Sequence, residues 1–327
     1  MRNLYIHCGL PKTGTTAIQR FLTAERDKLA DLGFDYPQLG LCSFGIAHHN
    51  LSNELFGHND FNPERGSIRD FLDYLERPER KPNVIISSEG FINCVSSQRS
   101  QQGFLDFLRA AITRNDNIYV ILAFRMFSKY FDSWYVQRLK TGNLEIDIPA
   151  YVDASKIWMR RLFKSLELLR EVVGEDRLVI IDLESGDGDA ISAVLSRLKI
   201  PLEQADSLRS RANEKLGLKK AAYIYQFHGN AHYIPRQTSE RAVLLMRNLL
   251  RLSEFPDETY RYRVVPYRYA AAIQRLASRK VPQFLAAKLE RVIRPEDERF
   301  QAVDLSSVVL TAEEKAFLDQ AIPVQAA

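Results

Sequence analysis

The sequence predicts an α/β fold in which a parallel sheet is covered by helices on both faces and is followed by a mostly helical region. Strand-like and helix-like patterns alternate through the first two thirds of the 327 residues. The strand-like runs are short and apolar throughout, as in strands that are buried on both faces of a parallel sheet. After about residue 217 the patterns become mostly helical and basic.

Each expected element is a run with its own periodicity. The expected strands are the apolar runs 4–8, 83–87, 118–124 and 177–182. The helices expected between and after them from their apolar spacing are 15–32, 104–112, 128–140, 151–173, 189–198, 219–227, 239–252 and 267–276. We therefore predict an α/β core over 1–216 and a mostly helical extension over 217–327. That extension is either a cap packed on the core or a surface for a partner.

The turn after the first strand is a candidate phosphate-binding loop. Strand, glycine loop and helix together point backbone N–H groups and a positive helix end at a bound phosphate. Gly9 and Gly14 have the spacing of the nucleotide-triphosphatase pattern G-x-x-x-x-G-K-[ST]. However, the lysine is Lys12, two residues before the second glycine, and Thr15 and Thr16 follow that glycine. The pattern predicts a P-loop-type sheet that binds a phosphate, and it is a poor match to a nucleotide triphosphatase.

This loop resembles that of the sulfotransferases that use 3′-phosphoadenosine 5′-phosphosulfate (PAPS). In these enzymes the P-K-[ST]-G-T-T segment binds the 5′-phosphosulfate group. The match here is without a gap: Pro11, Lys12, Thr13, Gly14, Thr15 and Thr16.

Two further segments resemble the same family. In the family an arginine at a strand end and a helical serine eight residues later hold the 3′-phosphate, and Arg125 and Ser133 have this spacing. The surrounding text, FRMFSKYFDSWYVQRLKTG, resembles the bacterial carbohydrate-type members. Arg211 and Asn213 match an R-x-N sequence in a later loop that closes over the nucleotide. Glu214 departs from the family there, because a serine is common at that position.

The resemblance implies transfer of a sulfuryl group from PAPS to an acceptor hydroxyl, with 3′-phosphoadenosine 5′-phosphate (PAP) as the second product. The bacterial likeness implies a carbohydrate or glycolipid acceptor. Lys12 would stabilise the departing 5′-phosphate, and backbone N–H groups of the loop would hold it. No metal is expected, because Lys12 and the helix end supply the positive charge.

A base should take the proton from the acceptor hydroxyl. Glu89 is the first candidate, because it follows the strand 83–87 and related enzymes use a Glu or a His near the acceptor. The alternative is that Glu89 caps the next segment or pairs with an arginine. The rival base lies in the pair His48 and His49, with His49 favoured; such a pair can also be a packing or surface feature. Zinc is not expected, because no cysteine has paired ligand spacing with these histidines or with His58.

Charge, cysteine count and apolar run lengths argue against three classes: nucleic-acid-binding, disulfide-stabilised and membrane-spanning proteins. The net charge of +4 fits an anionic ligand and gives no argument for a nucleic-acid partner. Three scattered cysteines form no disulfide framework, which favours a reducing compartment. No apolar run has the length that spans a membrane, and the first strand begins too near Met1 for a signal peptide. A cytoplasmic location is therefore expected.

Two other functions stay open from the residues alone. One is a P-loop kinase for a nucleotide or small molecule, although Ser-Ser-Glu stands at the end of the strand 83–87, where an aspartate would hold magnesium. The other is a non-catalytic nucleotide- or RNA-binding module that uses the basic and aromatic residues of 260–269.

Overall fold

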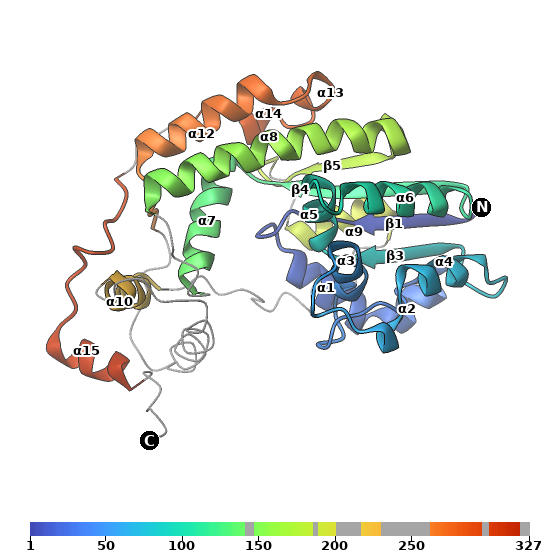
Figure 1. Ribbon diagram of the computed structural model, residues 1–327, viewed down its shortest axis with the longest axis horizontal. Coiled ribbons are helices and arrows are strands. Elements are labelled where there is room, and N and C mark those ends of the chain that lie inside the picture. The colour runs from blue at the N-terminus through green and yellow to red at the C-terminus, as the bar shows by residue number, and fades with distance from the viewer. Residues whose placement is uncertain (141–146, 186–188, 201–216, 230–261, 296–300, 321–327) are drawn as a thin grey trace. The chain divides into compact units, whose positions relative to one another are not determined.

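The computed structural model describes residues 1–140, 147–185, 189–200, 217–229, 262–295 and 301–320 (Figure 1). The chain divides into two compact units. The first comprises 1–126, 157–213 and 277–294, and the second comprises 127–156, 214–276 and 295–327. The boundary expected at 216/217 stays a prediction.

The first unit contains a five-stranded sheet in the order β2-β3-β1-β4-β5. Every neighbouring pair of strands is parallel. The strands are β1 Asn3–His7, β2 Phe34–Asp35, β3 Asn83–Ser87, β4 Asn117–Phe124 and β5 Leu178–Asp182. The predicted α/β class is confirmed.

The strand β1 lies between β3 and β4. From β1 the chain crosses the sheet in one direction, and from β3 and β4 it crosses in the other direction. After β1 the chain goes to β2 at one edge, whereas after β3 and β4 it goes toward β5 at the other edge. Right-handed crossovers place connections of opposite direction on opposite faces of the sheet. Ligands bind outside the carboxyl ends of the strands at such a point, so the turn after β1 occupies the favoured position.

Helices cover both faces of the sheet in this unit. Ile18 of α1, Leu29 of α2 and Leu195 of α9 pack in one buried cluster with Ile85 and Ile121 of the sheet. Alternate strand residues point to the other face, where α6 contacts β4. Figure 1 shows α1 and α2 on one side of the strands and α6 on the other. The helices are α1 Thr15–Ala24, α2 Arg26–Asp31, α3 His49–Phe56, α4 Ile68–Glu76, α5 Gly90–Ser96, α6 Gln101–Ile112, α9 Ala190–Leu198, α13 Gln283–Ala286 and α14 Glu290–Ile293.

The second unit is helical where it is described. It contains α7 Phe127–Lys140, α10 Leu218–Gly229 and α15 Ala312–Asp319, and parts of α8 Ile148–Val173 and α12 Tyr267–Lys280. Asp132 of α7 is buried and accepts hydrogen bonds from the N–H groups of Val264 and Val265 at 2.7 and 2.9 Å. A buried carboxylate thus fixes the chain that leads into α12 against α7.

Most predicted elements agree with the structure within a few residues, and the differences lie in short elements. The helix expected over 15–32 is two helices, because α1 ends at Ala24 and α2 starts at Arg26. The short strand β2 and six short helices of the described segments had no predicted counterpart: α3, α4, α5, α13, α14 and α15. The helix expected over 239–252 lies outside the described residues.

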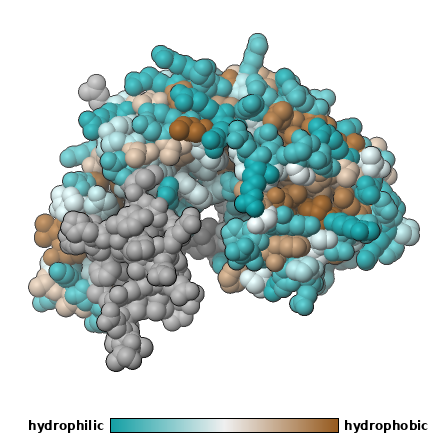
Figure 2. Space-filling view, viewed as in Figure 1, coloured by the Kyte–Doolittle hydropathy of each residue, from teal (hydrophilic) through white to brown (hydrophobic). Residues whose placement is uncertain are grey.

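The surface is mostly hydrophilic on the face that Figure 2 shows, with hydrophobic residues distributed among the polar ones. Among the described residues, the exposed large hydrophobic side chains are Met1, Leu32, Phe44, Ile157 and Val309. No helix of the described segments is long and apolar enough to cross a lipid bilayer.

Candidate functional site

The turn between β1 and α1 is bound to the neighbouring strand β4. The N–H of Cys8 donates to the carbonyl of Ile121 at 2.9 Å, and the N–H of Ala123 donates to the carbonyl of Gly9 at 3.2 Å. These bonds continue the pairing of β1 with β4 past the last strand residue, so the loop starts from a fixed position.

Three residues of this loop have a left-handed backbone: Gly9, Lys12 and Gly14, with φ of 70°, 67° and 86°. At Gly9 an added Cβ would lie 2.7 Å from Cγ2 of Thr15, and at Gly14 it would lie 2.7 Å from Cβ of Ala190. Both glycines therefore meet two requirements, a positive φ and a close neighbour. Lys12 has a side chain and lacks the conformational freedom of glycine. A left-handed backbone is uncommon for a lysine, and such uncommon conformations cluster at ligand sites.

The loop ends at the N-terminus of α1, which begins at Thr15. Among the described residues no side chain caps this helix, and Gly14 occupies the N-cap position. The first N–H groups of a helix, here those of Thr15 and Thr16, have no partner within the helix. Together with the helix dipole they form a site for an anion.

Lys12 is half-buried and lies in the electrostatic range of two other predicted residues. Burial, and after it the positive charge of Arg125, lower the pKa of Lys12, while the negative charge of Glu89 acts in the opposite direction. Arg125 directly follows β4, and Glu89 lies two residues after β3. The three predicted residues therefore gather around β1, as the strand order requires.

Glu89 lies close to the loop and is held by two side chains. Cβ of Glu89 would be 3.4 Å from a Cβ placed on Gly9. Its Oε2 accepts a hydrogen bond from Nε2 of Gln19 at 2.9 Å and lies 3.8 Å from Nε2 of His49. Glu89 occupies the N-cap position of α5, but its side chain makes no capping hydrogen bond among the described residues. The carboxylate thus faces the site.

The two adjacent histidines have different surroundings. His49 begins α3, and its side chain is one third exposed beside Glu89. His48 is fully buried, with Nε2 3.0 Å from the carbonyl of Pro37 and Nδ1 accepting from the N–H of Ser87 at 3.2 Å. Burial lowers the pKa of His48 to about 3. Of the pair, His49 can contact a substrate, and His48 fixes the chain that leads into α3.

A second buried histidine, His7, ends β1 directly before the loop. Its Nδ1 lies 2.7 Å from Oγ of Ser87, which is its partner in the register of β1 and β3. Burial lowers the pKa of His7 to about 4, although the charge of Glu89 acts to raise it. His7 and His48 therefore form, with Ser87, a neutral layer beneath the carboxyl ends of β1 and β3.

The other predicted site residues fall in three groups. Pro11 and Thr13 are buried, and Oγ of Thr13 donates to the carbonyl of Leu10 at 2.5 Å, so this hydroxyl shapes the loop. Ser133 lies on α7 in the second unit, and its pairing with Arg125 stays a prediction. Arg211 and Asn213 lie outside the described residues, so their role also stays a prediction.

Three residues near Glu89 were not predicted. Gln19 lies four residues after Thr15, which places both on one face of α1, and this spacing could have indicated it. Ser88 contacts Nδ1 of His49 at 2.7 Å, and Ser52 contacts Ser88 at 3.0 Å. Ser52 has no sequence signature, because the helix α3 that carries it is short and polar.

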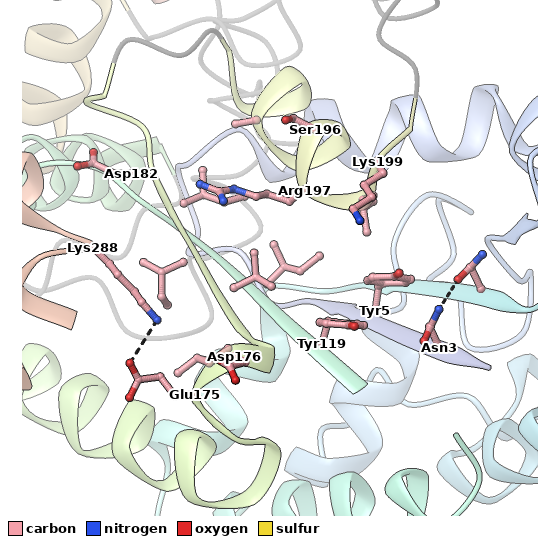
Figure 3. A pocket seen from close by; sticks show the side chains of 18 of the residues that line it. Asn3, Tyr5, Tyr119, Glu175, Asp176, Asp182, Ser196, Arg197, Lys199 and Lys288 are labelled. Atoms are coloured by element: carbon pink, nitrogen blue, oxygen red, sulfur yellow. Dashed lines mark hydrogen bonds and ion pairs between the residues drawn. The ribbon is translucent and has the colours of Figure 1, made fainter. Parts of the chain in front are cut away.

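A cavity in the described part of the first unit lies elsewhere, along β4 and β5 (Figure 3). Its volume is about 990 Å³, and neither Lys12, Glu89 nor Arg125 lines it. Figure 3 shows Arg197 and Lys199 across the cavity from the rings of Tyr5 and Tyr119. Lys288 lies 3.6 Å from Glu175 at its rim. No residue of the loop between β1 and α1 lines this cavity.

A metal ion has no evident ligand set in the described segments, where no three of His, Cys, Asp and Glu lie together in a suitable arrangement. Cys8, Cys42 and Cys94 are free thiols. Among the described residues, Lys12, Arg125 and the helix end bring positive charge to the site.

No model of a known protein family matches the chain. No curated protein sequence matches it either. A solved structure with some likeness is the sulfotransferase domain from the Synechococcus PCC 7002 olefin synthase, at 16% sequence identity and a TM-score of 0.37. The likeness covers 62% of this chain and 75% of that domain. A TM-score of this size does not establish a shared fold, so the chemistry must be inferred from the residues of the site.

Proposed function

We propose that this protein transfers a sulfuryl group from PAPS to a hydroxyl of an acceptor. The observation that carries the proposal is the position of Glu89 against the phosphate loop. Its Cβ would be 3.4 Å from a Cβ on Gly9, and its charge acts on Lys12. A candidate base thus lies beside the loop that carries the candidate leaving-group cation, and its charge acts on that cation.

The loop supplies what the donor requires. The N–H groups at the start of α1 would hold the 5′-phosphate, and Lys12 would neutralise the charge that forms on it when the sulfur–oxygen bond breaks. Arg125, with Ser133 from the second unit, would bind the 3′-phosphate, and Arg211 with Asn213 would close over the nucleotide.

The acceptor reacts on the Glu89 side of the loop. Its oxygen attacks the sulfur, the bond from sulfur to the 5′-phosphate oxygen breaks, and the proton goes to Glu89, with His49 as the rival acceptor of that proton. PAP and the sulfated acceptor leave. The acceptor class that the bacterial likeness favours is a carbohydrate or glycolipid.

Binding distinguishes this function from a kinase or an RNA-binding module. We expect calorimetry to give clear binding of PAP without magnesium and much weaker binding of ATP with magnesium. The transfer itself is measured as PAP released from PAPS when carbohydrate acceptors are added. Tight binding of ATP and none of PAP would overturn the proposal in favour of a kinase. Binding of RNA in moderate salt, without binding of PAP, would favour the non-catalytic module.

A further inference from the structure

Two buried serines lie beside His49 and connect it to the start of α5. Oγ of Ser88 is 2.7 Å from Nδ1 of His49 and 3.0 Å from Oγ of Ser52. Both serines are at most 1% exposed. Oγ of Ser52 also donates to the carbonyl of His49 at 3.0 Å. The imidazole is thus fixed on its inner side by a pair of hydroxyl groups.

The backbone is built closely around this pair. Residue 90 is a glycine, and an added Cβ would lie 2.6 Å from Cβ of Ser52 and 3.0 Å from Oγ of Ser88. The N–H of Gly90 donates to Oγ of Ser88 at 3.1 Å. The hydroxyl oxygen of Ser88 therefore accepts a hydrogen bond from a fixed donor. Its single proton must be donated either to Nδ1 of His49 or to Oγ of Ser52.

These two choices correspond to the two neutral forms of His49. If Ser88 donates to Nδ1, the histidine carries its proton on Nε2, and Ser52 donates to Ser88 in place of the carbonyl of His49. If Ser88 donates to Ser52, Nδ1 must carry the proton and donate to Ser88. The serines permit both forms, so a neighbour on the outer side of the ring decides between them.

That neighbour is Glu89. Its Oε2 lies 3.8 Å from Nε2 of His49, a separation that is electrostatic because it exceeds hydrogen-bond length. A carboxylate at this position favours a proton on Nε2. The same oxygen accepts from Gln19 at 2.9 Å, while Oε1 has no hydrogen-bond partner within the described part of the chain.

We propose that Ser88 is a positioning residue: by donating to Nδ1 it supports the form of His49 that Glu89 favours, with the proton on Nε2, so that His49 and Gln19 together hold Glu89 by Oε2. Oε1 then takes the proton of the acceptor hydroxyl. This deepens the proposed function and rests on it for the chemical step. The step balances: the acceptor oxygen bonds to sulfur, the bond from sulfur to the 5′-phosphate oxygen breaks, and the hydroxyl proton moves to Oε1.

The titratable and charged groups that act on the pair of Glu89 and His49 are Lys12, His7, Tyr36 and His48.

The first experiment reads the tautomer of His49 on the full chain, with neither PAPS nor acceptor. Nitrogen-15 NMR of the imidazoles distinguishes protonated from unprotonated Nδ1, and a His49→Gln variant assigns the signal among the six histidines. We expect unprotonated Nδ1 in the natural protein and a mixture in Ser88→Ala. Ser100→Ala is the matched control, because Ser100 is buried and its hydroxyl donates to the carbonyl of Cys94 at 3.0 Å. A proton on Nδ1 in the natural protein at neutral pH would overturn the proposal, and this reading needs no variant of Ser88.

The second experiment asks whether Ser88 acts through His49. We expect Ser88→Ala to lower kcat by about 10–100-fold, the range for losing a group that orients a functional histidine, with PAP affinity unchanged. In a His49→Gln background the same substitution should have no further effect, and it should alter the acidic limb of the pH–rate profile only when His49 is present. An equal loss in both backgrounds would show a merely structural role. If the natural protein has the expected tautomer but transfers no sulfuryl group, the proposed function fails while the link between Ser88 and His49 stands.

Discussion

Acid should destabilise this protein at a higher pH than carboxylate titration alone would, because two buried histidines lie beneath the site. Burial lowers the pKa of His7 from 6.5 to about 4 and that of His48 from 6.5 to about 3. A folded-state pKa below the unfolded value means that the unfolded chain binds more protons. The free energy of unfolding therefore falls as pH decreases through 6.5, and it continues to fall until each group is charged in the folded state.

The hydrogen bonds of His48 explain why it resists charging. Nδ1 already accepts from the N–H of Ser87, and the ring is surrounded by protein, with Tyr36 at 4.8 Å between ring centres. Charging the ring would add a second proton, on Nδ1, and that proton would point at the N–H donor of Ser87. Because pH 5 lies about 1.5 pH units below the unfolded pKa, each histidine should cost roughly 2 kcal/mol there, at ~1.4 kcal/mol per unit. Together they should cost roughly 4 kcal/mol, a large part of a typical unfolding free energy of about 5–15 kcal/mol.

The assay is urea unfolding between pH 7.5 and pH 5. We expect the natural protein to lose roughly 4 kcal/mol of unfolding free energy and His48→Gln to lose only about half of that, whatever its stability at pH 7.5. His58→Gln is the control for replacing a histidine by glutamine, because the side chain of His58 is 58% exposed. A His48→Gln variant with the same slope as the natural protein would refute the reasoning.

Three further predictions concern the loop and its neighbours. Lys12→Ala should leave the urea midpoint unchanged and lower kcat by about 10²–10³-fold, since a charge at a developing oxyanion is worth ~3–4 kcal/mol; near-normal turnover would remove Lys12 from the mechanism. Arg125→Ala should weaken PAP by about 10–100-fold in calorimetry and leave AMP, which lacks the 3′-phosphate, almost unaffected; equal losses would argue against 3′-phosphate recognition. Gly9→Ala should destabilise more than Gly45→Ala and should also weaken PAP. Both glycines have φ near 70°, but only Gly9 has a neighbour within 4 Å of the added Cβ, so equal costs would show that backbone strain alone matters.

The sequence was sufficient for four of the five strands of the described sheet and for the glycine-containing loop after β1, because both depend on local patterns. Continuous apolar runs predicted β1, β3, β4 and β5 within a residue or two. The spacing of Gly9 and Gly14 predicted a tight loop between a strand and a helix, and in the structure both glycines have positive φ. In each case the physical cause, burial on two faces or a left-handed backbone, acts on the residues that carry the pattern.

The surroundings of the candidate base could not be predicted in the same way. The helices α3 and α5 are short and contain polar residues, so they have no clear periodicity. Gln19 contacts Glu89 across 70 positions of the chain, and Ser52 contacts Ser88 across 36. Such contacts depend on which strands are neighbours in the sheet, and a single glutamine or serine has no pattern that indicates its partner.

The register of β3 against β1 is what connects the buried layer to the site. His7 pairs with Ser87, so the side chain of Ser87 meets His7 on the inner side while Ser88 and Glu89 continue toward the loop. A slip of one residue would exchange the faces of Ser87 and Ser88. Ser88 would then lose Nδ1 of His49, and Glu89 would move away from Gln19 and from Gly9. The hydrogen bond of His7 to Ser87 and that of Ser87 to His48 fix this register from within the core. The two neutral histidines therefore set the position of Glu89 relative to Lys12, although neither of them is placed to contact a substrate.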